Sequence, residues 1–144
     1  MWMWMGKLLT VLGILGLYGS ASALAQTRTT SNEGSEVYII SPVDGERVTS
    51  PVTIKFGIRG MEIAPAGTEK ANTGHHHLII DAPLPPFDEP IPSDENYRHF
   101  GGGQTEVTLE LGPGNHTLQL ILADHNHIPH EPVIKSGRVI ITVK

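Results

Sequence analysis

The chain has 144 residues, a formal net charge of −5 and no cysteine. A disulfide-stabilised scaffold and a thiolate metal site of the blue-copper type are therefore excluded. The Lys and Arg residues form no cluster, which argues against nucleic-acid binding. The histidines are the unusual feature, because all eight lie between His75 and His130.

The first 25 residues have the pattern of a secretory signal peptide. Lys7 precedes an apolar run over residues 8 to 18, and Ala23 and Ala25 supply the small residues of a cleavage site before Gln26. The run is too short to cross a bilayer, which takes about 20 residues. We therefore expect a periplasmic or secreted protein without a membrane span in the mature chain. The alternative is an uncleaved N-terminal anchor.

Two further segments follow the predicted signal peptide. Residues 26 to 35 are small and polar, which predicts a flexible leader. Residues 36 to 144 are predicted to form one domain with its own core. Because Lys7 is the only charged residue among the first 25, the formal charge of the mature chain is −6.

The apolar pattern of the domain predicts short β-strands. Alternation over residues 52 to 59, 105 to 111 and 116 to 124 is typical of half-buried strands, and apolar runs predict strands at 37 to 40, 75 to 81 and 138 to 144. Five prolines between residues 83 and 92 predict a long irregular connection over residues 82 to 103. We expect an immunoglobulin-like antiparallel β-sandwich of about seven strands, with a small Greek-key barrel as the alternative.

The predicted sandwich brings distant histidines together. Strands 75 to 81 and 116 to 124 are antiparallel neighbours in this fold, so the start of the first lies beside the end of the second. His99 could reach the same end of the domain through the glycines at 101 to 103. Imidazole is the commonest metal ligand in proteins. We predict a histidine cluster that binds metal at one end of the sandwich, formed by His75, His77, His125, His127 and His130, with His99 and Asp124 as auxiliary ligands.

Some details of this site stay open at the level of sequence. Both faces of strand 75 to 81 are apolar; the spacing of two favours His75 with His77 over His76. Asp124 could instead anchor a turn through backbone amides, or orient a histidine. His116 starts its strand and is about 26 Å from the other end, so we interpret it as a structural corner residue.

The ligand types predict copper(II) or zinc(II) as the bound ion, held for sequestration or delivery. A periplasmic or envelope protein is the expected partner besides the metal ion. One alternative is an envelope interaction or adhesion module in which the histidines are structural or sense pH. A copper-dependent redox enzyme is a lesser alternative, because the sequence shows no nucleophile and no paired general acid and base.

Three blocks resemble an uncharacterised family of exported bacterial proteins known as domain of unknown function 4399. They are residues 74 to 81 (GHHHLIID), 99 to 106 (HFGGGQTE) and 113 to 120 (PGNHTLQL), the last continuing to Asp124 and His130. The resemblance covers about residues 50 to 143. It implies a defined exported domain and brings no mechanism with it.

Overall fold

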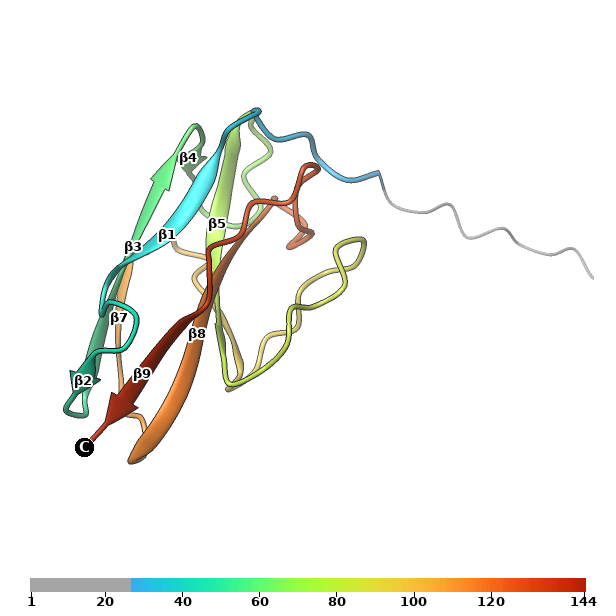
Figure 1. Ribbon diagram of the computed structural model, residues 1–144. Coiled ribbons are helices and arrows are strands. Elements are labelled where there is room, and N and C mark those ends of the chain that lie inside the picture. Colours follow the sequence, from blue (N-terminus) through green and yellow to red (C-terminus); the bar gives the residue numbers. More distant parts are fainter. Residues whose placement is uncertain (1–26) are drawn as a thin grey trace, which may run out of the picture.

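The computed structural model describes residues 27 to 144 (Figure 1). The predicted signal peptide and Gln26 lie outside the described residues. Within them the protein is all β, and no helix is long and apolar enough to cross a membrane. The strands are β1 Glu36–Ser41, β2 Arg47–Val48, β3 Val52–Arg59, β4 Glu62–Ile63, β5 Thr73–Ile80, β6 Tyr97–His99, β7 Glu106–Leu109, β8 Gly114–Ala123 and β9 Val139–Val143.

The strands form two sheets that pack face to face, as Figure 1 shows. One sheet has the order β1-β3-β7, and the other has the order β2-β9-β8-β5-β4 with β6 on the β5 edge. The predicted antiparallel pairing of β5 with β8 is present, and it sets His75 opposite Ala123 and His77 opposite Ile121. The immunoglobulin-like sandwich is therefore confirmed over its closed alternative.

The main core lies between the sheets and follows from the alternation along the strands. Ile54 and Phe56 of β3 face Leu78 and Ile80 of β5, and every second residue of β8 from Leu118 to Leu122 joins them. These side chains are all less than 5% exposed. Burial of such aliphatic and aromatic groups stabilises the fold by about 1.5 to 3 kcal/mol each.

A second, smaller apolar cluster covers the outer face of the β5–β8 sheet. Ile79, Ile121 and Ala123 point away from the main core, and Ile91 from the Pro-rich connection lies on them together with Leu84, Phe87 and Tyr97. Because both of its faces are covered, β5 is buried at all eight positions. The three consecutive apolar residues at the end of β5, Leu78 to Ile80, reflect this double burial.

The connection over residues 82 to 103 differs from the sequence expectation in one part. Its last residues form β6, which pairs with β5 and places His99 opposite His77. A strand of three residues is too short to be recognised from the periodicity of the sequence. The short strands β2 and β4 were not predicted for the same reason.

The segment predicted as a flexible leader makes contacts with the domain. Thr30 forms a β-bridge with Glu131, and the Ser31 amide donates to the Glu131 carbonyl at 3.0 Å. The loop between β8 and β9 thus supplies hydrogen-bond partners to these polar residues.

Candidate metal site

Four histidines from three parts of the chain meet on the outer face of the β5–β8 sheet. His75 and His77 project from the outer face of β5, and the paired β6 supplies His99. His127 comes from the turn after β8. All six pairwise distances between the four ring centroids lie between 4.7 and 6.0 Å. We call these four side chains the histidine cluster.

The ring nitrogens of the histidine cluster point toward one another. The Nε2 atoms of His75 and His77 are 3.0 Å apart, and those of His127 and His99 are 3.1 Å apart. One ligand atom from each of His75, His77 and His99 lies within 4.8 Å of the other two, a grouping that could hold a metal ion. With metal–nitrogen bonds near 2.0 to 2.1 Å, neighbouring ligand nitrogens are about 2.9 to 3.4 Å apart. The two short nitrogen pairs therefore have the spacing of adjacent ligands on one ion.

Burial favours the neutral form of three of these imidazoles, His75, His77 and His99. Desolvation, and secondarily repulsion from His99 and His127, lowers the pKa of His75 from 6.5 to about 4. Desolvation, followed by repulsion from His75, lowers the pKa of His77 to about 2, and desolvation lowers that of His99. A neutral imidazole has a free lone pair, so the side chains need not lose a proton before they bind a metal ion near neutral pH.

The turn after β8 positions His127. The His127 amide donates to the Asp124 carbonyl at 2.9 Å, and His127 has a φ of 66°, a left-handed conformation that His adopts more readily than most residues. The Ile91 amide donates to the His127 carbonyl at 2.8 Å, so the Pro-rich connection holds this turn from the other side. The turn thereby directs the His127 ring back toward β6.

The remaining predicted ligands have other partners. Asp124 accepts hydrogen bonds from the Thr29 hydroxyl at 2.5 Å and from the amides of Asn126 and Ile128 at 2.9 and 3.0 Å. These contacts match the turn-anchoring role that was the alternative for this residue, and they lower its pKa despite desolvation. Three hydrogen-bond donors thus fix the orientation of this carboxylate.

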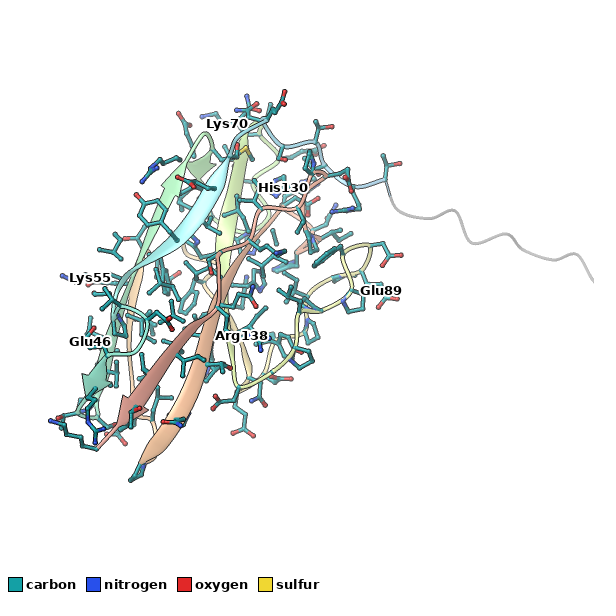
Figure 2. The ribbon with its side chains drawn as sticks, viewed as in Figure 1. Glu46, Lys55, Lys70, Glu89, His130 and Arg138 are labelled. Atoms are coloured by element: carbon teal, nitrogen blue, oxygen red, sulfur yellow. The ribbon has the colours of Figure 1, made fainter. Side chains whose placement is uncertain are left out.

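His125 and His130 lie apart from the histidine cluster. His125 Nε2 accepts from the Asn126 side-chain amide at 3.0 Å. His130, labelled in Figure 2, is fully buried, and its Nε2–H donates to the Thr73 carbonyl at 3.1 Å. A Cβ at Gly74 would lie 2.8 Å from the Ala123 carbonyl oxygen and 2.9 Å from both His130 Cε1 and a side-chain carbon of Leu122. These contacts explain the glycine before the three histidines.

His76 faces the opposite way, into the main core. Its ring centroid lies 5.2 Å from that of Phe56, and the side chain is fully buried. Neither ring nitrogen of His76 has a hydrogen-bond partner. Desolvation lowers its pKa to about 4. His76 therefore cannot share an ion with its two neighbours on β5.

His116 is the corner residue that its position predicted. Its Nδ1–H donates to Asp81 Oδ2 at 2.6 Å and its Nε2–H donates to the Gly112 carbonyl at 2.7 Å. Because both ring nitrogens face acceptors, the Gly112 hydrogen bond first and Asp81 second raise the pKa of His116. His116 thus links the start of β8 to Asp81 and Gly112.

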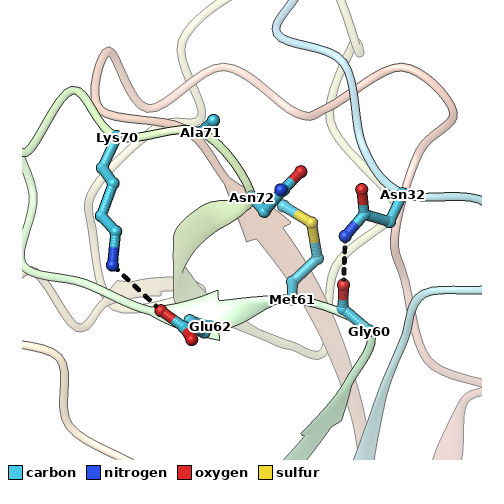
Figure 3. A pocket seen from close by; sticks show the side chains of 7 residues that line it. All are labelled: Asn32, Gly60, Met61, Glu62, Lys70, Ala71 and Asn72. Atoms are coloured by element: carbon cyan, nitrogen blue, oxygen red, sulfur yellow. Dashed lines mark hydrogen bonds and ion pairs between the residues drawn. The ribbon is translucent and has the colours of Figure 1, made fainter.

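The histidine cluster does not line either of the two described cavities. One, of about 430 Å³, lies beside the turn between β3 and β4 (Figure 3) and is lined by Asn32, Gly60, Met61, Glu62, Lys70, Ala71 and Asn72. The other lies near Asp81 and Arg138. The four imidazoles are arranged around one another, which suits an ion better than an organic substrate.

Comparison with known proteins adds the family and nothing more. No curated protein and no solved structure matches the chain. Residues 54 to 144 match the model of a family described as a domain of unknown function, DUF4399. The match spans most of the chain, so this protein belongs to the DUF4399 family.

Proposed function

We propose that this protein binds one copper(II) or zinc(II) ion through His75, His77 and His99, with His127 as the fourth ligand. The observation that carries the proposal is the convergence of four imidazoles whose Nε2 atoms approach in pairs at 3.0 and 3.1 Å. Without an ion, these two nitrogen pairs can each form one N–H···N hydrogen bond, whereas an ion would bind the lone pairs of all four rings at once.

The ligand set also favours these two metals by its chemistry. The cluster offers imidazole nitrogen without thiolate, and the nearby carboxylate of Asp124 is occupied by its own donors. Imidazole suits copper and zinc, and affinities of nitrogen sites generally peak at copper(II). Magnesium and calcium prefer oxygen ligands and do not fit this site.

The exposure of the ligands supports binding and release of an ion. His75 and His77 are at most 1% exposed, whereas His99 and His127 are only partly buried. An ion can therefore enter and leave past the last two rings without opening the sheet. We propose sequestration or delivery of metal in the periplasm or outside the cell, the compartment that the N-terminal sequence predicts, and a partner protein there that supplies or accepts the ion.

Titration tests the binding proposal. The full 144-residue chain is expressed without a histidine tag, and the purified protein is titrated calorimetrically with Zn(II) and Cu(II). We expect one tight site, which a His75→Ala/His127→Ala double variant loses. A His116→Ala/His125→Ala double variant removes the same number of imidazoles outside the cluster and should bind as the wild type does. Wild-type binding no tighter than that of the His75→Ala/His127→Ala variant would overturn the proposal.

Export is tested separately. We expect the protein recovered from the periplasmic or extracellular fraction to begin at Gln26, as N-terminal sequencing or intact mass would show. Recovery of an intact N-terminus in the membrane fraction would favour the anchored alternative instead.

A further inference from the structure

A short N-terminal segment is bound to the loop that carries His127. Residues 28 to 31, which we call the N-terminal strap, run beside residues 129 to 132. The Arg28 guanidinium donates to the Pro129 carbonyl at 3.1 Å, to the His130 carbonyl, and to the Glu131 carboxylate. The Glu131 amide donates to the Thr29 carbonyl at 2.9 Å. The strap thus adds a parallel bridge, Thr30–Glu131, to a loop that also makes antiparallel bridges to β8 at Ala123–Pro129 and Ile121–Lys135.

The strap is held at both ends. The Ser31 hydroxyl donates to the Pro132 carbonyl at 2.7 Å. One residue further on, the Asn32 side-chain amide donates to the Gly60 carbonyl at 2.7 Å, the contact drawn in Figure 3. Anchorage on the turn between β3 and β4 ties the strap to the opposite sheet of the sandwich. The strap therefore connects the loop between β8 and β9 to the turn that follows β3.

Thr29 connects the strap to the turn of His127. Its hydroxyl donates to Oδ2 of Asp124 at 2.5 Å, and the other oxygen, Oδ1, accepts from the amides of Asn126 and Ile128. Those two amides flank His127 on either side. The strap thus holds Oδ2 of Asp124 through Thr29. Oδ1 of the same carboxylate holds the two peptide groups that flank His127, and these direct the His127 ring toward His99.

The carboxylate is also close enough to the cluster to interact with it electrostatically. The negative charge of Asp124 raises the pKa of His75 in opposition to the larger effect of burial. A carboxylate free to rotate could compete with imidazole for a divalent ion, since carboxylate is itself a zinc ligand. The Thr29 hydrogen bond occupies the oxygen that points away from the turn and so removes this competitor.

We propose that Thr29 is a positioning residue for the metal site: through Asp124 it aims His127 at the ion and keeps the carboxylate out of the ligand set. The inference rests on the proposed function. In this proposal the N-terminal strap determines whether the ion has four imidazole ligands. Loss of an outer partner that orients a ligand lowers metal affinity by about 10- to 100-fold in comparable sites.

Copper(II) is the probe for the test, because the nitrogen hyperfine signal in its electron paramagnetic resonance spectrum reports on the number of imidazole ligands. The untagged full chain is compared with Thr29→Val, Thr29→Ser and His127→Ala variants. We expect Thr29→Val to bind Cu(II) about 10- to 100-fold more weakly with one imidazole fewer, and Thr29→Ser to restore both. A Thr29→Val/His127→Ala double variant should bind no more weakly than His127→Ala alone, because both changes remove the same ligand.

Thr53→Val is the matched control. It removes a threonine hydroxyl that is paired with Thr108 at 2.9 Å on the other sheet, far from the histidine cluster in the fold. It should leave the Cu(II) signal unchanged. A Thr29→Val protein with the wild-type spectrum would overturn the role of Thr29 while leaving the proposed function intact, even if its melting temperature were lower. A wild-type protein that binds no Cu(II) would overturn both.

Discussion

The two faces of β5 carry the same side chain in different surroundings. On the outer face, His75 and His77 meet two further imidazoles that arrive on β6 and on the turn after β8. On the inner face, His76 meets Phe56 and no polar partner. Burial lowers the pKa of all three histidines. The comparison shows that burial is common to both faces, whereas a group of imidazoles that could hold an ion is present on the outer face.

Burial of the imidazoles opposes folding on both faces, but only on the outer face could a bound ion offset this effect. A metal ion bound by His75 and His77 would satisfy their nitrogens and stabilise the folded state in proportion to its free concentration. No such compensation reaches the inner ring of His76. The following experiments are chosen to separate the two faces.

Acid should produce the largest effect. Below pH 6.5 these histidines bind protons in the unfolded chain but remain neutral in the folded one, so stability falls as the pH falls toward the folded-state pKa. The folded values near 4 for His75 and His76 correspond to about 3 kcal/mol each by pH 4. We expect the metal-free protein to lose stability steeply between pH 6.5 and 4 in urea denaturation followed by circular dichroism.

Addition of metal should separate the contributions of the two faces of β5 to this loss of stability in acid. Saturating Zn(II) at pH 6.5 should stabilise the wild type by about 2.7 kcal/mol when the free ion is at 100 times its dissociation constant. The same addition should stabilise a His76→Leu variant equally. A stability that does not change between pH 6.5 and 4 would contradict the burial of neutral imidazoles on either face.

Removal of one outer ring should have the next largest effect. His77→Ala takes away the most deeply buried ligand, and we expect its Zn(II) affinity to drop by at least about 100-fold, more than the loss of an outer-sphere partner causes. Competition with a colorimetric chelator measures the change. His125→Ala is the control, since this ring is two residues from His127 but bonds to Asn126. Equal losses in both variants would refute the assignment of the ligands.

Replacement of the inner ring should act in the opposite direction. His76→Leu removes two buried nitrogens without hydrogen-bond partners, and we expect the metal-free protein to gain about 1 to 3 kcal/mol of stability at pH 7. Zn(II) affinity should stay at the wild-type value. The same change on the outer face, His75→Leu, removes the hydrogen-bond partner of His77 Nε2 and should abolish tight metal binding. A loss of affinity in His76→Leu would mean that the two faces are not independent.

The smallest effect is expected at His116, beyond the end of β5. Its pKa is raised in the folded state, so its stabilising contribution is complete below pH 6.5 and disappears as the pH rises through the folded value. His116→Ala should therefore cost about 1 kcal/mol at pH 6 and less at pH 9, since the Asp81 contact is partly exposed. Denaturant titrations at the two pH values measure this difference. An equal cost at both pH values would indicate that only packing is lost.

Much of the fold follows from sequence because period-2 patterns in β3, β5 and β8 carry their own signature. The pairing of β5 with β8 then predicts that residues near 75 and 125 meet, and His75 and His127 do so with ring centroids 5.1 Å apart. It was harder to predict which face of β5 points toward the histidine cluster. Leu78 and Ile79 are equally apolar, because the Pro-rich connection covers the face that a sandwich usually exposes to water.

The strand that carries His99 and the side-chain partner of Asp124 could not be predicted. His99 reaches the cluster on β6, through backbone pairing with His77, and three residues have too little periodicity to announce a strand. Asp124 is satisfied by Thr29, a residue from a polar segment with no pattern of its own. Both depend on tertiary hydrogen bonds, which leave no trace in local sequence.

A crystal structure of the untagged protein grown with Zn(II), with diffraction recorded on both sides of the zinc absorption edge, tests the central claim most directly. We predict one anomalous peak on the outer face of β5, about 2.0 to 2.1 Å from a ring nitrogen of each of His75, His77 and His99, with His127 completing the site. A protein crystal with no peak among these rings, or with its zinc bound only at His125 or His130, would contradict it.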